Sequence, residues 1–143
     1  MNEKMSADVR WKQRFENFER GFLLLRSALD NRTPGQLSQL EQEGVIQRFE
    51  YTFELAWKTL KDYLENAGVT LDQITPRAVI KAAFAAKLID DGQAWIDMLG
   101  DRNLMSHTYD CAKFQEVVAA LKDRYLAKLE EMYLLLKKLT LEA

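Results

Sequence analysis

Apolar side chains recur every three or four positions along most of this 143-residue chain, with only six glycines and two prolines to interrupt them. In the first segment five bulky residues share this spacing: Trp11, Phe15, Phe18, Phe22 and Leu25. Steps of three and four place side chains on one face of an α-helix, whereas a half-buried strand alternates every two residues. No segment shows sustained alternation between turn signals. The sequence therefore predicts an all-α protein.

Turn and capping signals divide the first half of the chain into two long helices. Asp8 is the expected N-cap of the first helix, and a turn-forming segment at residues 30–36 should end it. A second helix is expected from about Ser38 to Asn66, and Gly68 suits the position just after its C-terminus. The inner face of this helix should carry Phe49, Phe53, Ala56, Leu60 and Tyr63.

The second half begins with Thr75 as an N-cap and Pro76 at the first helical position. The sequence DDGQ at residues 90–93 should end this third helix, and Asp110 can cap a long last helix. The fourth helix should bury Trp95, Met98, Leu99 and Met105, and the last should bury Phe114, Val118, Leu121, Tyr125, Leu129, Met132, Leu136 and Leu139. We expect an up-and-down bundle of about five helices, forming one domain over residues 1–143. Because the bulky stripes exceed what a small bundle can cover, we also expect a homodimer formed through the helices.

The composition excludes several classes of protein. A net charge of −2 does not favour binding of nucleic acid through bulk charge, although a small basic site remains compatible with it. One cysteine, Cys111, excludes an intramolecular disulfide, and one histidine makes a zinc site improbable. There is neither a signal-peptide pattern nor an apolar run long enough to span a bilayer, so we expect a cytoplasmic protein without a metal or cofactor.

The segment RNLMSHTYD, residues 102–110, contains the only histidine. At about 100° per residue, its polar side chains can share one broad face if the fourth helix continues as far as Tyr109. These side chains are Arg102, Asn103, Ser106, His107 and Tyr109. Arginine can stabilise negative charge on a phosphate, and histidine can transfer a proton near neutral pH. These roles suit metal-free RNA cleavage, in which a 2′-hydroxyl attacks its own phosphate.

A structural interpretation of the same segment is also possible. An arginine near a helix end is commonly a solvated or ion-paired group, and a lone histidine is more often a polar side chain than a catalyst. Arg102 lies on the stripe expected to point inward, where its charge needs a partner. Glu50 and Glu54 on the second helix are the candidate partners or phosphate-site supports, and the sequence leaves open which is used.

Other prominent residues of the second helix have a structural interpretation too. Trp57 suits a core or a dimer interface better than a base-stacking platform. Lys58 and Lys61 follow Glu54 at helical spacing, which is typical of a solvated, salt-bridged face. The alternative for these two lysines is a cleft in which they meet RNA phosphates.

Arg102, His107 and Tyr109 together resemble the R-x4-H-x-Y signature of HEPN proteins of the HepT type. The flanking sequences RFEYTFELAWKTLKDYLENAG and TPRAVIKAAFAAKLIDDGQAWIDML resemble the nucleotidyltransferase substrate-binding branch of that family, and the likeness covers roughly residues 8–140. It implies a HEPN-like helical homodimer in which the arginine and histidine of two subunits face one another across a cleft.

The resemblance also implies a function. Several such proteins are metal-independent ribonuclease toxins, neutralised when a separate small nucleotidyltransferase transfers AMP to the motif tyrosine. By this likeness Arg102 and His107 are the catalytic pair, Asn103 is a polar helper and Tyr109 is the modification site. The alternatives are a non-catalytic substrate-binding subunit of a two-component nucleotidyltransferase, and a helical scaffold. The chain has no Gly-Ser dipeptide and no Asp-x-Asp pair, so nucleotide transfer must come from another polypeptide.

Overall fold

The computed structural model describes residues 3–107 and 110–142, with only the backbone of residues 3–5, and all regular elements in these ranges are helical. The elements are α1 (Glu3–Leu29), the short 3-10 turn η1 (Pro34–Gln36), α2 (Gln39–Asn66), α3 (Pro76–Ala85), α4 (Gly92–Met105), α5 (Cys111–Ala120), the π-helical turn η2 (Leu121–Tyr125) and α6 (Leu126–Leu141). Because α5, η2 and α6 follow one another without a break, the chain forms five rods. The predicted all-α bundle of about five helices is confirmed.

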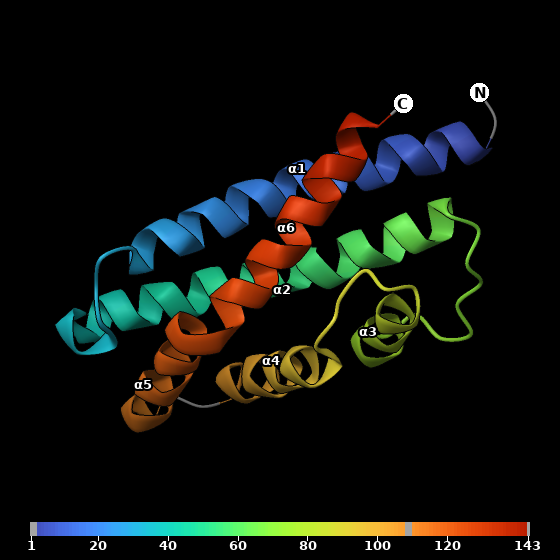
Figure 1. Cartoon of the computed structure of the whole chain (residues 1–143). Helices are drawn as coiled ribbons and strands as arrows, with labels where there is room; N and C mark the ends of the chain where they lie inside the picture. Colours follow the sequence, from blue (N-terminus) through green and yellow to red (C-terminus); the bar gives the residue numbers. More distant parts are fainter. Residues whose placement is uncertain (1–2, 108–109, 143) are drawn as a thin grey trace.

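The two long helices α1 and α2 form the centre of the molecule and run antiparallel (Figure 1). The rod of α5, η2 and α6 packs against both of them, and α6 crosses obliquely over α1. The shorter helices α3 and α4 lie on the side of α2 away from α1 (Figure 1). This arrangement places α2 between all the other helices, so its side chains meet neighbours on several faces.

Aromatic side chains from different helices meet in the core. The rings of Phe15 on α1 and Tyr133 on α6 stack with centroids 5.9 Å apart. Those of Phe53 on α2 and Trp95 on α4 lie 6.2 Å apart. Such ring pairs contribute about 0.5–1.5 kcal/mol beyond the area that they bury. The aromatic stripes predicted from the sequence therefore join the helices to one another.

Side-chain caps form at three helix starts, and two of them, Thr75 and Asp110, were predicted. The hydroxyl of Ser38 accepts a hydrogen bond from the Glu41 N–H at 3.1 Å, and the Glu41 carboxylate accepts one from the Ser38 N–H at 2.9 Å. Thr75 caps α3 and Asp110 caps α5 in the same side-chain manner. At the end of α2, Gly68 has a φ of 85°, a conformation that a side chain would strain.

The expected N-cap role of Asp8 is wrong, because α1 already begins at Glu3. The preceding residues are mostly good helix formers, which extends the helix by a turn. Asp8 instead accepts hydrogen bonds from the Trp11 indole at 3.1 Å and the Asn66 amide at 3.4 Å. Its carboxylate thereby joins α1 to the end of α2.

The predicted long last helix contains a π-helical turn over Leu121–Tyr125. Two side chains of this turn reach other helices: Lys122 donates to the Leu29 carbonyl at 2.6 Å, and Tyr125 donates to Asp101 at 2.5 Å. Neither contact has a local sequence signal, because the partners are distant in the chain. π turns are uncommon and often occur near functional sites.

Candidate functional site

Helix α4 ends at Met105, so the motif does not continue along one helix as far as Tyr109. Ser106 is the C-cap; its N–H donates to the Arg102 carbonyl at 3.2 Å, and its hydroxyl lies 3.1 Å from the same carbonyl. The chain must then leave the helix, because Asp110 begins α5. The condition for one shared helical face, that the fourth helix continues as far as Tyr109, is therefore not met.

Arg102 lies near the end of α4 with its side chain 28% exposed. One terminal nitrogen, Nη2, donates to Glu54 Oε2 on α2 at 2.8 Å, and the other, Nη1, donates to Asn103 Oδ1 at 3.3 Å. Its Nε is buried and has no hydrogen-bond partner among the described residues. Of the two carboxylates that the sequence offered, the guanidinium pairs with Glu54.

The carboxylate of Glu54 contacts donor groups of its own helix as well as Arg102 of α4. The Trp57 indole donates to Oε2 at 3.0 Å, and Lys58 Nζ lies 3.1 Å from Oε1. Burial raises the pKa of Glu54, but the hydrogen bonds from Trp57 and Lys58 and the charge of Arg102 outweigh this effect and hold the pKa below its ordinary value. Glu54 is therefore ionised at neutral pH and fixes the direction of the guanidinium.

Glu50 lies one turn before Glu54 on α2 and contacts Ser106 of the motif. The Ser106 hydroxyl lies 3.1 Å from Glu50 Oε2 and from the Arg102 carbonyl, which makes a link between α4 and α2. Thus the structure brings Arg102, Asn103, Ser106, Glu50 and Glu54 together at the contact of these two helices.

His107 lies beyond the regular helix, in a turn closed by a 3.0 Å hydrogen bond from its N–H to the Leu104 carbonyl. Its side chain is exposed, and within the described residues the imidazole has no hydrogen-bond partner. An exposed imidazole is free to exchange a proton with a ligand. Tyr109, the expected modification site, lies outside the described residues.

This arrangement offers complementary groups for a phosphate-containing ligand. A guanidinium held by a carboxylate stabilises negative charge without losing side-chain entropy on binding. An unhindered imidazole a few residues away supplies or removes a proton. Both belong to residues of α4 and the turn that follows it.

The sequence prediction missed one contact beside the motif. Asp101, adjacent to Arg102, accepts the hydrogen bond from Tyr125 of the π turn. Burial and this hydrogen bond raise the pKa of Tyr125 above its ordinary value, so the phenol remains protonated. The contact of Lys58 with Glu54 follows the helical spacing noted in the sequence, whereas the Trp57 contact with Glu54 and the pairing of residues 101 and 125 were not predicted.

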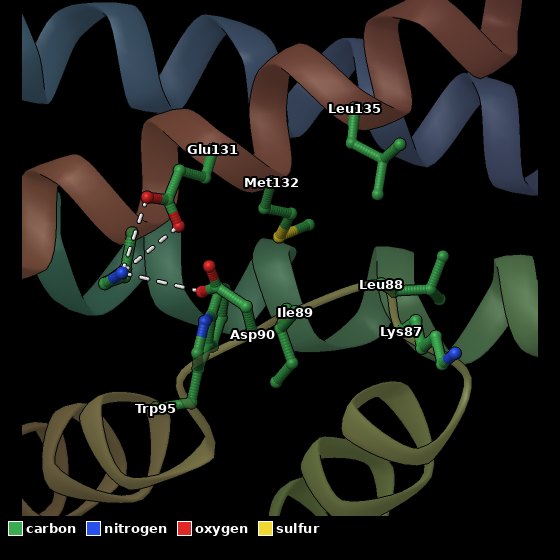
Figure 2. Close-up of a pocket in the computed structure, with 9 residues that line it drawn as sticks. Lys87, Leu88, Ile89, Asp90, Trp95, Glu131, Met132 and Leu135 are labelled. Atoms are coloured by element: carbon green, nitrogen blue, oxygen red, sulfur yellow. Dashed lines mark hydrogen bonds and ion pairs between the residues drawn. The ribbon is translucent and has the colours of Figure 1, made fainter.

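A separate hollow of about 210 Å³ lies between α6 and the connection from α3 to α4 (Figure 2). Trp95 and Met132 line its apolar wall, and Lys128 at its rim contacts both Asp90 and Glu131. No motif residue lines it. Within the described ranges, no group of His, Cys, Asp or Glu side chains is placed to hold a metal ion, and no helix is long and apolar enough to cross a membrane.

Solved structures of other proteins share this fold. A protein from Thermus thermophilus superposes with a TM-score of 0.71 at 32% identity, covering 85% of this chain and 98% of that one. A protein from Haemophilus influenzae, whose structure is described as the fold of a substrate binding domain of a nucleotidyltransferase, superposes with a TM-score of 0.72 at 25% identity. That match covers 86% of this chain and 98% of the other.

Among curated proteins, the chain is 34% identical over 83 residues to "Probable ribonuclease HepT" of Haemophilus influenzae. The alignment covers 56% of this chain and spans 57% of the length of that protein. The family model described as nucleotidyltransferase substrate binding protein like matches residues 13–138. Since this match includes nearly all of the bundle, the chain belongs to the family of HepT-like, nucleotidyltransferase substrate-binding proteins.

Proposed function

We propose that this protein is a HEPN-type, metal-independent RNA endonuclease, with Arg102 and His107 as its catalytic pair. The observation that carries the proposal is the R-x4-H-x-Y motif at the end of α4, where the guanidinium is fixed by Glu54 and the imidazole is exposed. The relative named "Probable ribonuclease HepT" supports the same activity. Asn103, which contacts Arg102, is the polar helper.

In the proposed reaction the 2′-hydroxyl of a ribose attacks the adjacent phosphorus. The imidazole of His107 removes the proton of that hydroxyl, and the Arg102 guanidinium stabilises the charge that develops on the phosphorane oxygens. The bond from phosphorus to the 5′-oxygen breaks, and this oxygen takes a proton from an imidazolium. The products are a 2′,3′-cyclic phosphate and a 5′-hydroxyl, and no oxidant, reductant or metal is consumed.

We further propose that two copies form the active unit and that a separate small nucleotidyltransferase regulates it. In a dimer, one imidazole can act as the base while the second protonates the leaving oxygen. Transfer of AMP to the Tyr109 hydroxyl would add a bulky anion two residues along the chain from His107 and exclude RNA phosphates. The protein would then be the toxin of a toxin–antitoxin pair.

The test combines RNA cleavage with intact mass. Purified wild-type protein in EDTA should cleave single-stranded RNA and leave 2′,3′-cyclic phosphate ends, and His107→Asn should not cleave it. Because this side chain is exposed, the variant should unfold at the same temperature as the wild type. Co-expression with the nucleotidyltransferase should add one AMP to the wild type and none to Tyr109→Phe. Intact RNA with unmodified wild-type protein would overturn the proposal.

A second function is favoured by the solved structure described as a substrate binding domain of a nucleotidyltransferase. In this case the bundle does not cleave RNA, and Arg102 holds a phosphate of the substrate that the transferase modifies. Transferase activity would then depend on this chain, and Arg102→Lys would raise the KM for substrate. If omitting the chain leaves transferase activity unchanged, this second function is excluded.

A further inference from the structure

Helix α3 differs from the other α-helices in its charge. Residues 76–89, which comprise α3 and the turn after it, contain Arg77, Lys81 and Lys87 and no acidic residue. Every other α-helix contains at least one Asp or Glu, and the chain as a whole carries a net charge of −2. Positive charge is therefore concentrated locally at α3 in an otherwise slightly acidic protein.

The cations of this segment are not neutralised within the molecule. Within the described ranges, the side chains of Arg77, Lys81 and Lys87 form neither ion pairs nor hydrogen bonds. Most cations elsewhere in the described residues do have an internal partner: Lys113, for example, lies 3.3 Å from Glu116. An anion that binds at α3 therefore has no internal carboxylate to displace.

Arg77 and Lys81 share one stripe of α3 with an exposed aromatic ring. The spacing of residues 77, 81 and 84 keeps their side chains within about 60° of one another on the helix. Phe84 is 51% exposed, whereas Val79, Ile80 and Ala83 on the same helix are buried. We call Arg77, Lys81 and Phe84 the α3 stripe.

A hollow of about 470 Å³ lies beside the stripe, between α3 and the connection from α2. Arg77 and Lys81 line it together with Thr70 and Thr75, and Asp72 is the one acidic residue in its lining. The hollow gives an anion access to the guanidinium from a concave surface rather than from open solvent. A carboxylate at position 72 opposes such binding and makes it adjustable by mutation.

From these observations we infer that the α3 stripe binds single-stranded RNA, with phosphates at Arg77 and Lys81 and a base stacked on Phe84. Unpaired cations beside an exposed ring are the combination that single-strand binding proteins use. An acidic protein surface would match the charges but does not require the ring. Figure 1 places α3 and α4 on the same side of α2, so RNA bound at α3 would lie on the side of α2 that carries α4 and the start of the motif. The inference rests on the proposed function and adds a second RNA contact to it.

The binding test uses fluorescence anisotropy with a single-stranded oligoribonucleotide in a His107→Asn background, which prevents cleavage. The double variant Arg77→Gln/Lys81→Gln should bind roughly tenfold more weakly at low salt and reduce the slope of log affinity against log salt by about 1.4. The matched control is Arg10→Gln/Lys138→Gln, which removes two exposed cations without internal partners from α1 and α6. This control should bind as the parent does. Equal losses in both double variants would overturn the inference.

Two single variants test the roles of the ring and the carboxylate. Phe84→Leu keeps an apolar side chain but removes the stacking surface, and it should weaken binding about tenfold. Asp72→Asn removes the opposing charge and should tighten binding. If neither variant changes RNA binding, the proposed placement of the strand is wrong. It is also wrong if α3 captures an acidic protein and binds no RNA.

Cleavage kinetics separate this inference from the proposed function. With His107 intact, the Arg77→Gln/Lys81→Gln variant should raise the KM for a long RNA and leave both kcat and the cleavage of a dinucleotide unchanged. If the wild type cleaves RNA and this variant matches it on long RNA, the α3 inference fails alone. If the wild type cleaves no RNA but the stripe variants lose binding, the proposed cleavage fails and the α3 inference holds.

Discussion

Arg102 of α4 and Glu54 of α2 form an ion pair of 2.8 Å across the contact between their helices. Both side chains are about two-thirds buried, with 28% and 31% of their surface exposed. If one partner of such a pair is removed, water can only partly solvate the charge that remains. The pair therefore contributes to stability as well as to the direction of the guanidinium.

Replacing Glu54 with glutamine should lower the free energy of unfolding by about 1–2 kcal/mol, because it leaves a half-buried guanidinium without its counter-charge. Urea denaturation of the wild type and of Glu54→Gln measures this change. The control is Glu116→Gln, which removes an exposed partner of Lys113 and should have no measurable effect. Similar losses in the two variants would contradict the role of the Arg102 pair.

Stability should fall in acid, in part through Glu54. The folded-state pKa of this carboxyl lies below its ordinary value of 4.5. A lowered pKa contributes stability above the ordinary pKa, and this contribution is lost as the pH falls through the folded-state value. The stability difference between the wild type and Glu54→Gln should therefore shrink below about pH 4.5. Denaturation curves at several pH values measure this difference. A difference that stays constant with pH would contradict the lowered pKa of Glu54.

The close approach of α1 and α2 at Gly21 predicts opposite effects for two glycine substitutions. A Cβ at Gly21 would lie 3.2 Å from both Thr52 Oγ1 and Tyr51 Cδ1, so Gly21→Ala should destabilise the protein by about 1–3 kcal/mol. Gly44 in α2 has open space around it, and Gly44→Ala should stabilise by about 0.5–1 kcal/mol. Thermal unfolding of both variants checks the signs. A stabilising Gly21→Ala would show that the two helices can separate at little cost.

Tyr125→Phe should lower the free energy of unfolding by about 1–2 kcal/mol at neutral pH, since it leaves Asp101 without the 2.5 Å hydrogen bond. The raised pKa of Tyr125 also gives the wild type a contribution that is present below about pH 10 and is lost at more alkaline pH. The variant should therefore approach the wild type in stability as the pH rises above 10. Denaturation at neutral and alkaline pH provides the comparison.

Most of the fold was predictable from local sequence patterns. The stripe that begins with Trp11 is buried as expected, and the capping residues Thr75 and Asp110 occupy the predicted positions. These features depend on spacing and on hydrogen bonds within a few residues. Asp8 was misassigned because a helix start depends on how well the preceding residues continue the helix, and here they do.

The site was predictable only in part. The sequence identified the motif and two candidate partners for Arg102, but the choice of Glu54 depends on how α4 packs against α2. The end of α4 at Met105 was not marked in the sequence, because neither glycine nor proline follows it in the motif. The π turn and its Tyr125 contact arise from tertiary packing and have no counterpart in the local pattern.

The neighbouring residues Asp101 and Arg102 are anchored to different helices, one to Tyr125 of the π turn and the other to Glu54 of α2. Rotation of α4 about its own axis in either direction would lengthen one of these two bonds. The rotational position of α4 is thus fixed by two contacts in its last turn, where the motif begins. A substitution that shifts α4 to change one of these two contacts would therefore also change the other.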